Sequence, residues 1–147
     1  MDKNIVKTQM ITLREGKMEE ISVLLVEDSR YSADLNIREI KKANVSIRFH
    51  KVVANQQSMR NALNEWEWDL IVSDNSMPGF SALGALEVRN SMDKKIPFII
   101  VSEDIFERDL DRAFREGCSA FVPKEELVML RKIVKEILIT HRMEDLF

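Results

Sequence analysis

The sequence predicts an α/β fold in which five parallel strands form one sheet with helices on both faces. Short apolar runs recur along the chain without polar alternation, which is typical of strands buried on both faces of a parallel sheet. Each run is followed by a segment long enough for a crossover helix, and right-handed crossovers place such helices on both sides of the sheet. The 147 residues fit one such domain and leave no room for a second of full size.

Five segments are expected to form the strands. Four of them are almost entirely apolar, whereas the second mixes Ile47, Phe49 and Val52 with polar residues and is therefore expected at an edge of the sheet. The expected strands cover residues 22–26, 45–53, 70–72, 97–101 and 120–122.

The helices are expected after each of these strands. The fourth carries Leu110 and Phe114 on its apolar stripe and is followed by Gly117, a natural helix stop. The last has the clearest helical period, over residues 127–138. The expected helices cover residues 32–43, 55–66, 81–91, 105–116 and 125–140.

Charge and composition exclude several classes of protein. With 22 Lys and Arg against 25 Asp and Glu, the net charge of −3 does not suit direct nucleic-acid binding through phosphate neutralisation. No apolar stretch reaches the roughly 18 residues of a membrane-spanning helix, so no membrane association is expected. Cys118 is the single cysteine, which excludes an intrachain disulfide and makes a reducing cytoplasm the expected compartment.

The two ends of the chain lie outside the strand and helix pattern. Residues 1–20 lack the continuous apolar region of a signal peptide, and we expect them to form a mobile N-terminal extension. Met18, just before the first strand, is a candidate functional start. Residues 141–147 are expected to be a short C-terminal tail, which leaves 21–140 for the domain.

Polar residues appear where the expected strands end. Glu27 and Asp28 follow the first strand, Asp74 follows the third, Ser102 follows the fourth and Lys124 follows the fifth. Ligands of open α/β sheets bind beyond the carboxyl ends of the strands, so these residues are the candidate functional groups.

Three of these groups are carboxylates, and they converge if the first and third strands are neighbours. Two carboxylates about 5 Å apart repel by roughly 3 kcal/mol at an effective dielectric of about 20, so Glu27, Asp28 and Asp74 must take up a proton or bind a cation. Oxygen ligands without His or Cys favour Mg²⁺. With Lys124 and Ser102 nearby, the set suits phosphoryl transfer, in which Asp74 acts as the nucleophile.

At this point the sequence resembles a known family. Four sequence features carry the resemblance: Val-Leu-Leu-Val before Glu27-Asp28, the Asp74-x-x-Met-Pro-Gly loop, Ser102 after Phe-Ile-Ile-Val, and Lys124 after Phe-Val-Pro. Together they look like the response-regulator receiver domain of two-component signalling, over about residues 21–140. The resemblance implies the flavodoxin-like strand order 2-1-3-4-5. Since no output domain follows, the chain looks like the stand-alone, chemotaxis-regulator-like members.

The resemblance also implies roles for the acidic residues. Asp74 would be the phosphoacceptor, and Glu27 and Asp28 would hold Mg²⁺ directly or through water. The backbone carbonyl of Ser76 would be a further metal ligand.

The remaining implied roles belong to the switch. Ser102 takes the position of the switch hydroxyl, Lys124 that of the lysine that contacts the phosphoryl group, and Phe121 that of the switch aromatic. The implied protein is a single-domain response regulator, a switch and not a turnover enzyme, which receives its phosphoryl group from a sensor histidine kinase or a phosphotransfer protein. Whether phosphorylation drives homodimerisation through the last two helices stays open.

Three positions depart from the family pattern. The first acidic residue is Glu27 where Asp is commoner, Glu103 follows Ser102 where small residues are usual, and Glu125 follows Lys124 where Pro is frequent.

Two other functions stay open at this stage. A degenerate receiver would bind partners without phosphorylation; Glu103 supports it, whereas the intact Asp74, Ser102 and Lys124 argue against it. An Mg²⁺-dependent aspartyl-phosphate phosphohydrolase typically has a second Asp two residues after the nucleophile, but Ser76 stands there.

Overall fold

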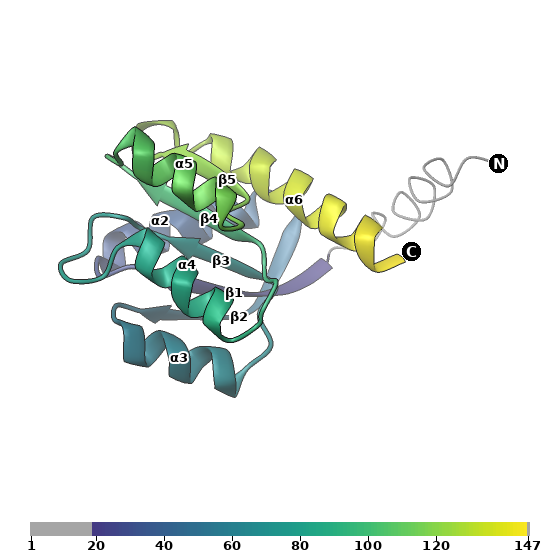
Figure 1. Cartoon of the computed structure of the whole chain (residues 1–147). Coiled ribbons are helices and arrows are strands. Elements are labelled where there is room, and N and C mark those ends of the chain that lie inside the picture. The colour runs from purple at the N-terminus through teal and green to yellow at the C-terminus, as the bar shows by residue number, and fades with distance from the viewer. Residues whose placement is uncertain (1–18, 147) are drawn as a thin grey trace.

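The computed structural model describes residues 19–146, which form one parallel sheet of five strands between helices (Figure 1). Strands and helices alternate along the chain, as the apolar runs predict. The elements are β1 (Glu19–Val26), α2 (Arg30–Lys41), β2 (Val45–Val53), α3 (Gln56–Glu65), β3 (Leu70–Ser73), α4 (Ala82–Ser91), β4 (Phe98–Ser102), α5 (Glu107–Arg115), β5 (Ala120–Pro123), a short 3-10 helix (Lys124–Glu126) and α6 (Met129–Leu146).

The strand order is β2-β1-β3-β4-β5, and every neighbouring pair is parallel. This confirms the order 2-1-3-4-5 and the edge position of β2. In this order β1 lies beside β3, with Val26 opposite Ser73, so the carboxyl ends of the two strands are adjacent. That adjacency is the feature of the fold that positions the site.

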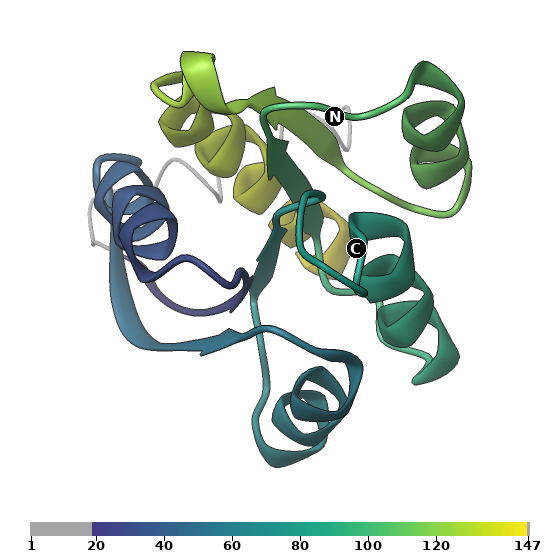
Figure 2. The same ribbon diagram turned by 90° about the vertical axis from the view of Figure 1, so that its left-hand side faces the viewer.

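The apolar residues of the strands contribute to two hydrophobic cores, one on each face of the sheet. One face packs against α2 and α6, and the other against α3, α4 and α5. Figure 2 shows this division, with α2 and α6 on one side of the strands and the other three helices opposite. Successive β1 residues alternate between the two cores: Val23 and Leu25 face α2 and α6, while Leu24 and Val26 face the other helices. Because both faces are covered, the central strands β1, β3 and β4 are apolar over most of their length.

Side-chain caps begin three of the helices. Ser29 precedes α2 and accepts from the backbone N–H of Ser32 at 3.2 Å, and Asn55 forms a reciprocal capping box with Ser58 at the start of α3. Ser81 accepts from the N–H of Gly84 at 3.1 Å at the start of α4.

Two expectations about the helices are wrong. The last helix does not begin at residue 125, because Lys124–Glu126 forms a 3-10 turn and the α-helix begins only at Met129. Phe114 does not lie on a buried stripe: its side chain is 44% exposed, and Ala113 is the residue of α5 that is fully buried. In a helix this short and highly charged, the apolar spacing does not fix which face is buried.

The ends of the elements differ from the expected domain limits of 21–140. β1 begins at Glu19 and α6 continues to Leu146, through most of the expected C-terminal tail. The expected N-terminal extension falls mainly on residues 1–18, which lie outside the described residues. Among residues 19–146, no helix is both long enough and apolar enough to cross a membrane.

Candidate functional site

The carboxyl ends of β1 and β3 bring the three predicted carboxylates together. The N–H of Asp74 donates to the carbonyl of Val26 at 2.9 Å, so the residue after β3 is held beside the end of β1. One carboxylate oxygen each from Glu27, Asp28 and Asp74 lies within 4.8 Å of the others. Asp28 is exposed, whereas the other two side chains are buried. The structure therefore forms the acidic cluster that the sequence predicts.

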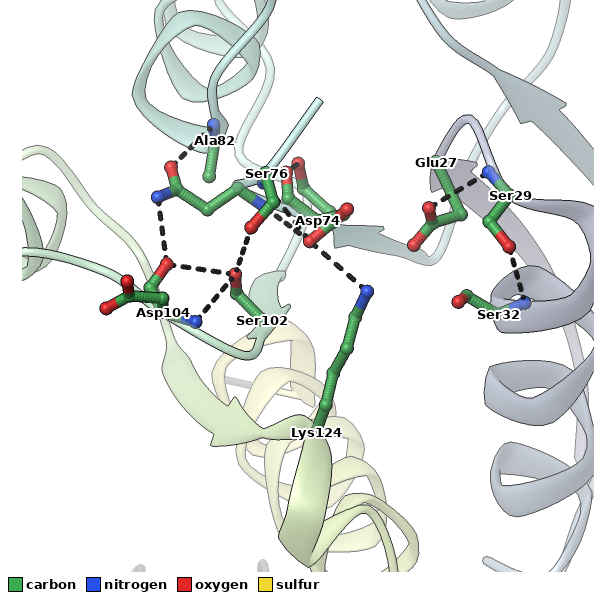
Figure 3. A network of polar contacts seen from close by, with 11 residues as sticks. Glu27, Ser29, Ser32, Asp74, Ser76, Ala82, Ser102, Asp104 and Lys124 are labelled. Carbon is green, nitrogen blue, oxygen red and sulfur yellow. Dashed lines mark hydrogen bonds and ion pairs between the residues drawn. The ribbon is translucent and has the colours of Figure 1, made fainter. Parts of the chain in front are cut away.

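Asp74 is buried, with 4% of its surface exposed, and its contacts fall on one carboxylate oxygen. Oδ1 accepts from the backbone N–H of Asn75 at 2.8 Å and of Ser76 at 3.2 Å. The same atom lies 3.6 Å from Nζ of Lys124, which reaches it from the end of β5 (Figure 3). The ammonium and the two N–H groups together compensate the buried charge of Asp74.

Glu27 is only 2% exposed and is less well compensated. Oε1 accepts from the N–H of Ser29 at 3.1 Å, but Oε2 is buried without a hydrogen-bond partner. Burial is the largest cause that raises the pKa of Glu27 to about 7, and the neighbouring carboxyl groups of Asp74 and Asp28 act in the same direction, whereas the Ser29 N–H and Lys124 lower it. A cation at this cluster would give Oε2 the partner that it lacks.

The acidic cluster and its orphaned oxygen fit a hard divalent cation. The donors are oxygens without His or Cys, which suits Mg²⁺, a metal that usually binds through one or two carboxylates and keeps several waters. Three clustered carboxyl groups, one with a buried unpaired oxygen, also provide negative charge that such an ion would balance.

Ser102, the predicted hydroxyl, ends β4 and is fully buried. Its Oγ lies 3.3 Å from Oγ of Ser76, donates to the carbonyl of Asp104 at 3.1 Å and accepts from the N–H of Asp104 at 3.4 Å. Figure 3 shows that these contacts lie on the opposite side of Asp74 from Glu27. The hydroxyl is thus held by the loop between β4 and α5.

Phe121 and Glu103 lie outside this set of polar contacts. Phe121 is half-buried on β5, paired in register with Ile100, and packs against the core beneath α3, α4 and α5. Glu103, directly after Ser102, is exposed.

One residue of the site did not follow from the sequence. The side-chain amide of Asn75 donates from Nδ2 to the carbonyl of Asp104 at 3.3 Å and accepts at Oδ1 from the N–H of Ala82 at 3.2 Å. It therefore joins the β4–α5 loop to the first residue of α4. The only sequence signal is an amide side chain directly after a strand and a few residues before a helix start, where Asn commonly bonds to backbone groups.

Residues 23–137 match the family model of the response regulator receiver domain. The chain is 25% identical over 138 residues to hybrid signal transduction histidine kinase G of Dictyostelium discoideum, a match that covers 91% of this chain and spans only 4% of that relative.

Solved structures share the fold. The signal receiver domain of a proposed Luxo repressor protein from Vibrio parahaemolyticus has a TM-score of 0.75 at 23% identity, covering 86% of this chain and 96% of that one. The receiver domain of a sensor histidine kinase from Pseudomonas aeruginosa PAO1 has a TM-score of 0.65 at 16% identity, covering 81% and 98%, and its crystal structure has a magnesium ion coordinated in the active site cleft.

Proposed function

Because the chain belongs to the response regulator receiver domain family of two-component signalling, we propose that it is a phosphorylation switch that accepts a phosphoryl group on Asp74 in an Mg²⁺-dependent reaction. The observation that carries the proposal is the setting of Asp74. It is a buried carboxylate with an ammonium 3.6 Å away and two further carboxylates within 4.8 Å.

The contacts of Asp74 suit its use as a nucleophile. The two N–H groups and Lys124 all contact Oδ1, so they orient the carboxylate and leave Oδ2 to attack. Oδ2 forms a bond to phosphorus while the bond from phosphorus to the donor breaks, and the donor keeps that electron pair. When the donor is a phosphohistidine protonated on its other ring nitrogen, neutral imidazole is the leaving group.

The proposed Mg²⁺ ligands are Glu27, Asp28, Asp74 and the backbone carbonyl of Ser76. The buried, unpartnered Oε2 of Glu27 and the all-oxygen donor set support this assignment. When bound, the ion supplies positive charge to the phosphoryl oxygens. A receiver domain of the same fold with magnesium in its cleft is consistent with the assignment.

Lys124 and Ser102 are proposed to contact the phosphoryl group once it is on Asp74. Lys124 already reaches the carboxylate, so its ammonium neutralises charge that develops on the phosphoryl oxygens. Ser102 must give up its hydrogen bond to the carbonyl of Asp104 before it can donate to the phosphoryl group. Phe121, half-buried on β5, is proposed to move with it and to alter the surface near α5.

We further propose a stand-alone response regulator whose phosphodonor is a sensor histidine kinase or a phosphotransfer protein, and whose output is contact with another protein. The family and the hybrid histidine kinase relative support this class of donor. The protein is proposed to be a switch and not a turnover enzyme.

The test is incubation with Mg²⁺ and a small acyl-phosphate donor, followed by intact mass. The wild type should gain one phosphoryl group, and Asp74→Asn should gain none. If the wild type gains none even with a cognate kinase, the proposal fails and the degenerate receiver is favoured. Continuous release of phosphate from many phosphate esters would instead favour the phosphohydrolase.

A further inference from the structure

The amide of Asn75 makes a bridge whose two ends are fixed by backbone chemistry. Ala82 offers an N–H, which needs an acceptor, and Asp104 offers a carbonyl, which needs a donor. Only one orientation of the amide satisfies both. A carboxylate of the same shape would place an acceptor against the Asp104 carbonyl, so this position distinguishes Asn from Asp.

The same carbonyl is also the acceptor for Ser102. It receives Oγ of Ser102 at 3.1 Å and Nδ2 of Asn75 at 3.3 Å. When Ser102 turns toward a phosphoryl group on Asp74, it withdraws its donor from this carbonyl. Among the described residues, the side-chain amide of Asn75 then still donates to the Asp104 carbonyl. This hydrogen bond resists a shift of the loop toward the site.

Asn75 is also linked directly to the phosphoacceptor, because its backbone N–H donates to Oδ1 of Asp74 at 2.8 Å. One residue therefore contacts Asp74 through its main chain, and α4 and the β4–α5 loop through its side chain. Asn75 therefore contacts both the residue that would be phosphorylated and the loop that would move.

Resting on the phosphoacceptor function of Asp74, we propose that Asn75 is a positioning residue that restrains the β4–α5 loop, and with it the Ser102 hydroxyl, in the unphosphorylated arrangement. Removing the bridge lets the loop follow Ser102 more readily. The protein then spends more time with the hydroxyl turned toward Asp74, and phosphorylation by a small donor speeds up.

The first experiment measures hydrogen exchange in the unphosphorylated 147-residue chain, at a peptide that contains Asp104. Asn75→Ala and Asn75→Asp should raise exchange there by about 2- to 10-fold, the population change that one net hydrogen bond supplies. Ser81→Ala is the matched control. It removes the neighbouring cap of α4 at the Gly84 N–H but leaves the Asn75 bridge intact, so it should not change exchange at Asp104.

The second experiment measures the rate of phosphorylation by the small acyl phosphate with Mg²⁺. Asn75→Ala should be faster than wild type by about 2- to 10-fold, and Ser81→Ala should match wild type. Unchanged exchange at Asp104 in both Asn75 variants, an equal rise in Ser81→Ala, or an Asn75→Ala rate no faster than wild type would overturn the proposal.

The two experiments separate this inference from the proposed function. If the wild type accepts no phosphoryl group, the function of Asp74 fails, and with it the role of Asn75 in phosphorylation. Exchange in the unphosphorylated protein still decides whether Asn75 restrains the loop.

Discussion

Replacing Glu27 with Gln should stabilise the metal-free protein at pH 8 and weaken its response to Mg²⁺. The pKa of Glu27 is raised from 4.5 to about 7, chiefly by burial, so the folded protein binds more protons than the unfolded chain between these values. The free energy of unfolding therefore falls as the pH rises from 4.5 to about 7, and this loss of stability is complete above about pH 7.

The magnitude follows from the pKa difference. At 1.36 kcal/mol per unit, a rise from 4.5 to about 7 corresponds to about 3 kcal/mol of lost stability at pH 8. Gln keeps an oxygen for the Ser29 N–H and removes the charge, so Glu27→Gln should recover about 2 kcal/mol at pH 8 and close to nothing at pH 4.5.

Urea unfolding at pH 4.5 and pH 8, with and without Mg²⁺, measures this effect. Mg²⁺ at about 100 times its Kd should stabilise the wild type by about 2.7 kcal/mol, and Glu27→Gln by less. Asp34→Asn on α2 is the matched control for the metal-free measurement, because that carboxylate is exposed and lies outside the acidic cluster, so its neutralisation should change stability little. A Glu27→Gln variant that is no more stable than wild type at pH 8, or whose advantage is the same at pH 4.5, would refute the reasoning.

Three further predictions test other parts of the site and the core. Lys124→Gln removes the ammonium 3.6 Å from Asp74, so phosphorylation by a small donor should slow by about 100-fold, and an unchanged rate would contradict this role. Ser102→Ala should still be phosphorylated, but it should lose most of the phosphorylation-dependent change in hydrogen exchange of the β4–α5 loop. Ser102→Thr keeps the hydroxyl and should keep that change. If the alanine variant responds like wild type, the hydroxyl is not the switch. Trp68→Phe removes a buried 2.8 Å hydrogen bond and some packing, so thermal or urea unfolding should show a loss of about 1–2 kcal/mol. Tyr31→Phe, at a side chain that is 74% exposed, should cost less than about 1 kcal/mol, and a larger cost there would contradict the burial argument.

The fold and the acidic cluster could be predicted because few arrangements of strands and helices are compatible with this pattern of apolar and polar residues. Strands buried on both faces are apolar throughout, and the polar residues that end them must collect at the carboxyl edge of the sheet. Glu27, Asp28 and Asp74 therefore converge once β1 and β3 are neighbours, as the structure has them.

Other features depend on tertiary contacts that periodicity does not report. The apolar spacing of the last helix begins before Met129, but the residues after Lys124 first form a 3-10 turn. Phe114 has the spacing of a buried residue, yet Ala113 faces the core, because α5 is short and most of its surface is charged. The bridge made by Asn75 joins the first residue of α4 to the β4–α5 loop, and a single polar residue in a loop does not specify such partners.

The most direct test of the central claim is to locate the phosphoryl group. Wild-type protein would be incubated with Mg²⁺ and the small acyl phosphate, trapped by borohydride reduction of the acyl phosphate, digested and analysed by peptide mass. The reduction product is expected at Asp74 in the Mg²⁺ sample and at a far lower level when Mg²⁺ is chelated. A product at Glu27 or Asp28 instead, or equal labelling of Asp74 without Mg²⁺, would contradict the account.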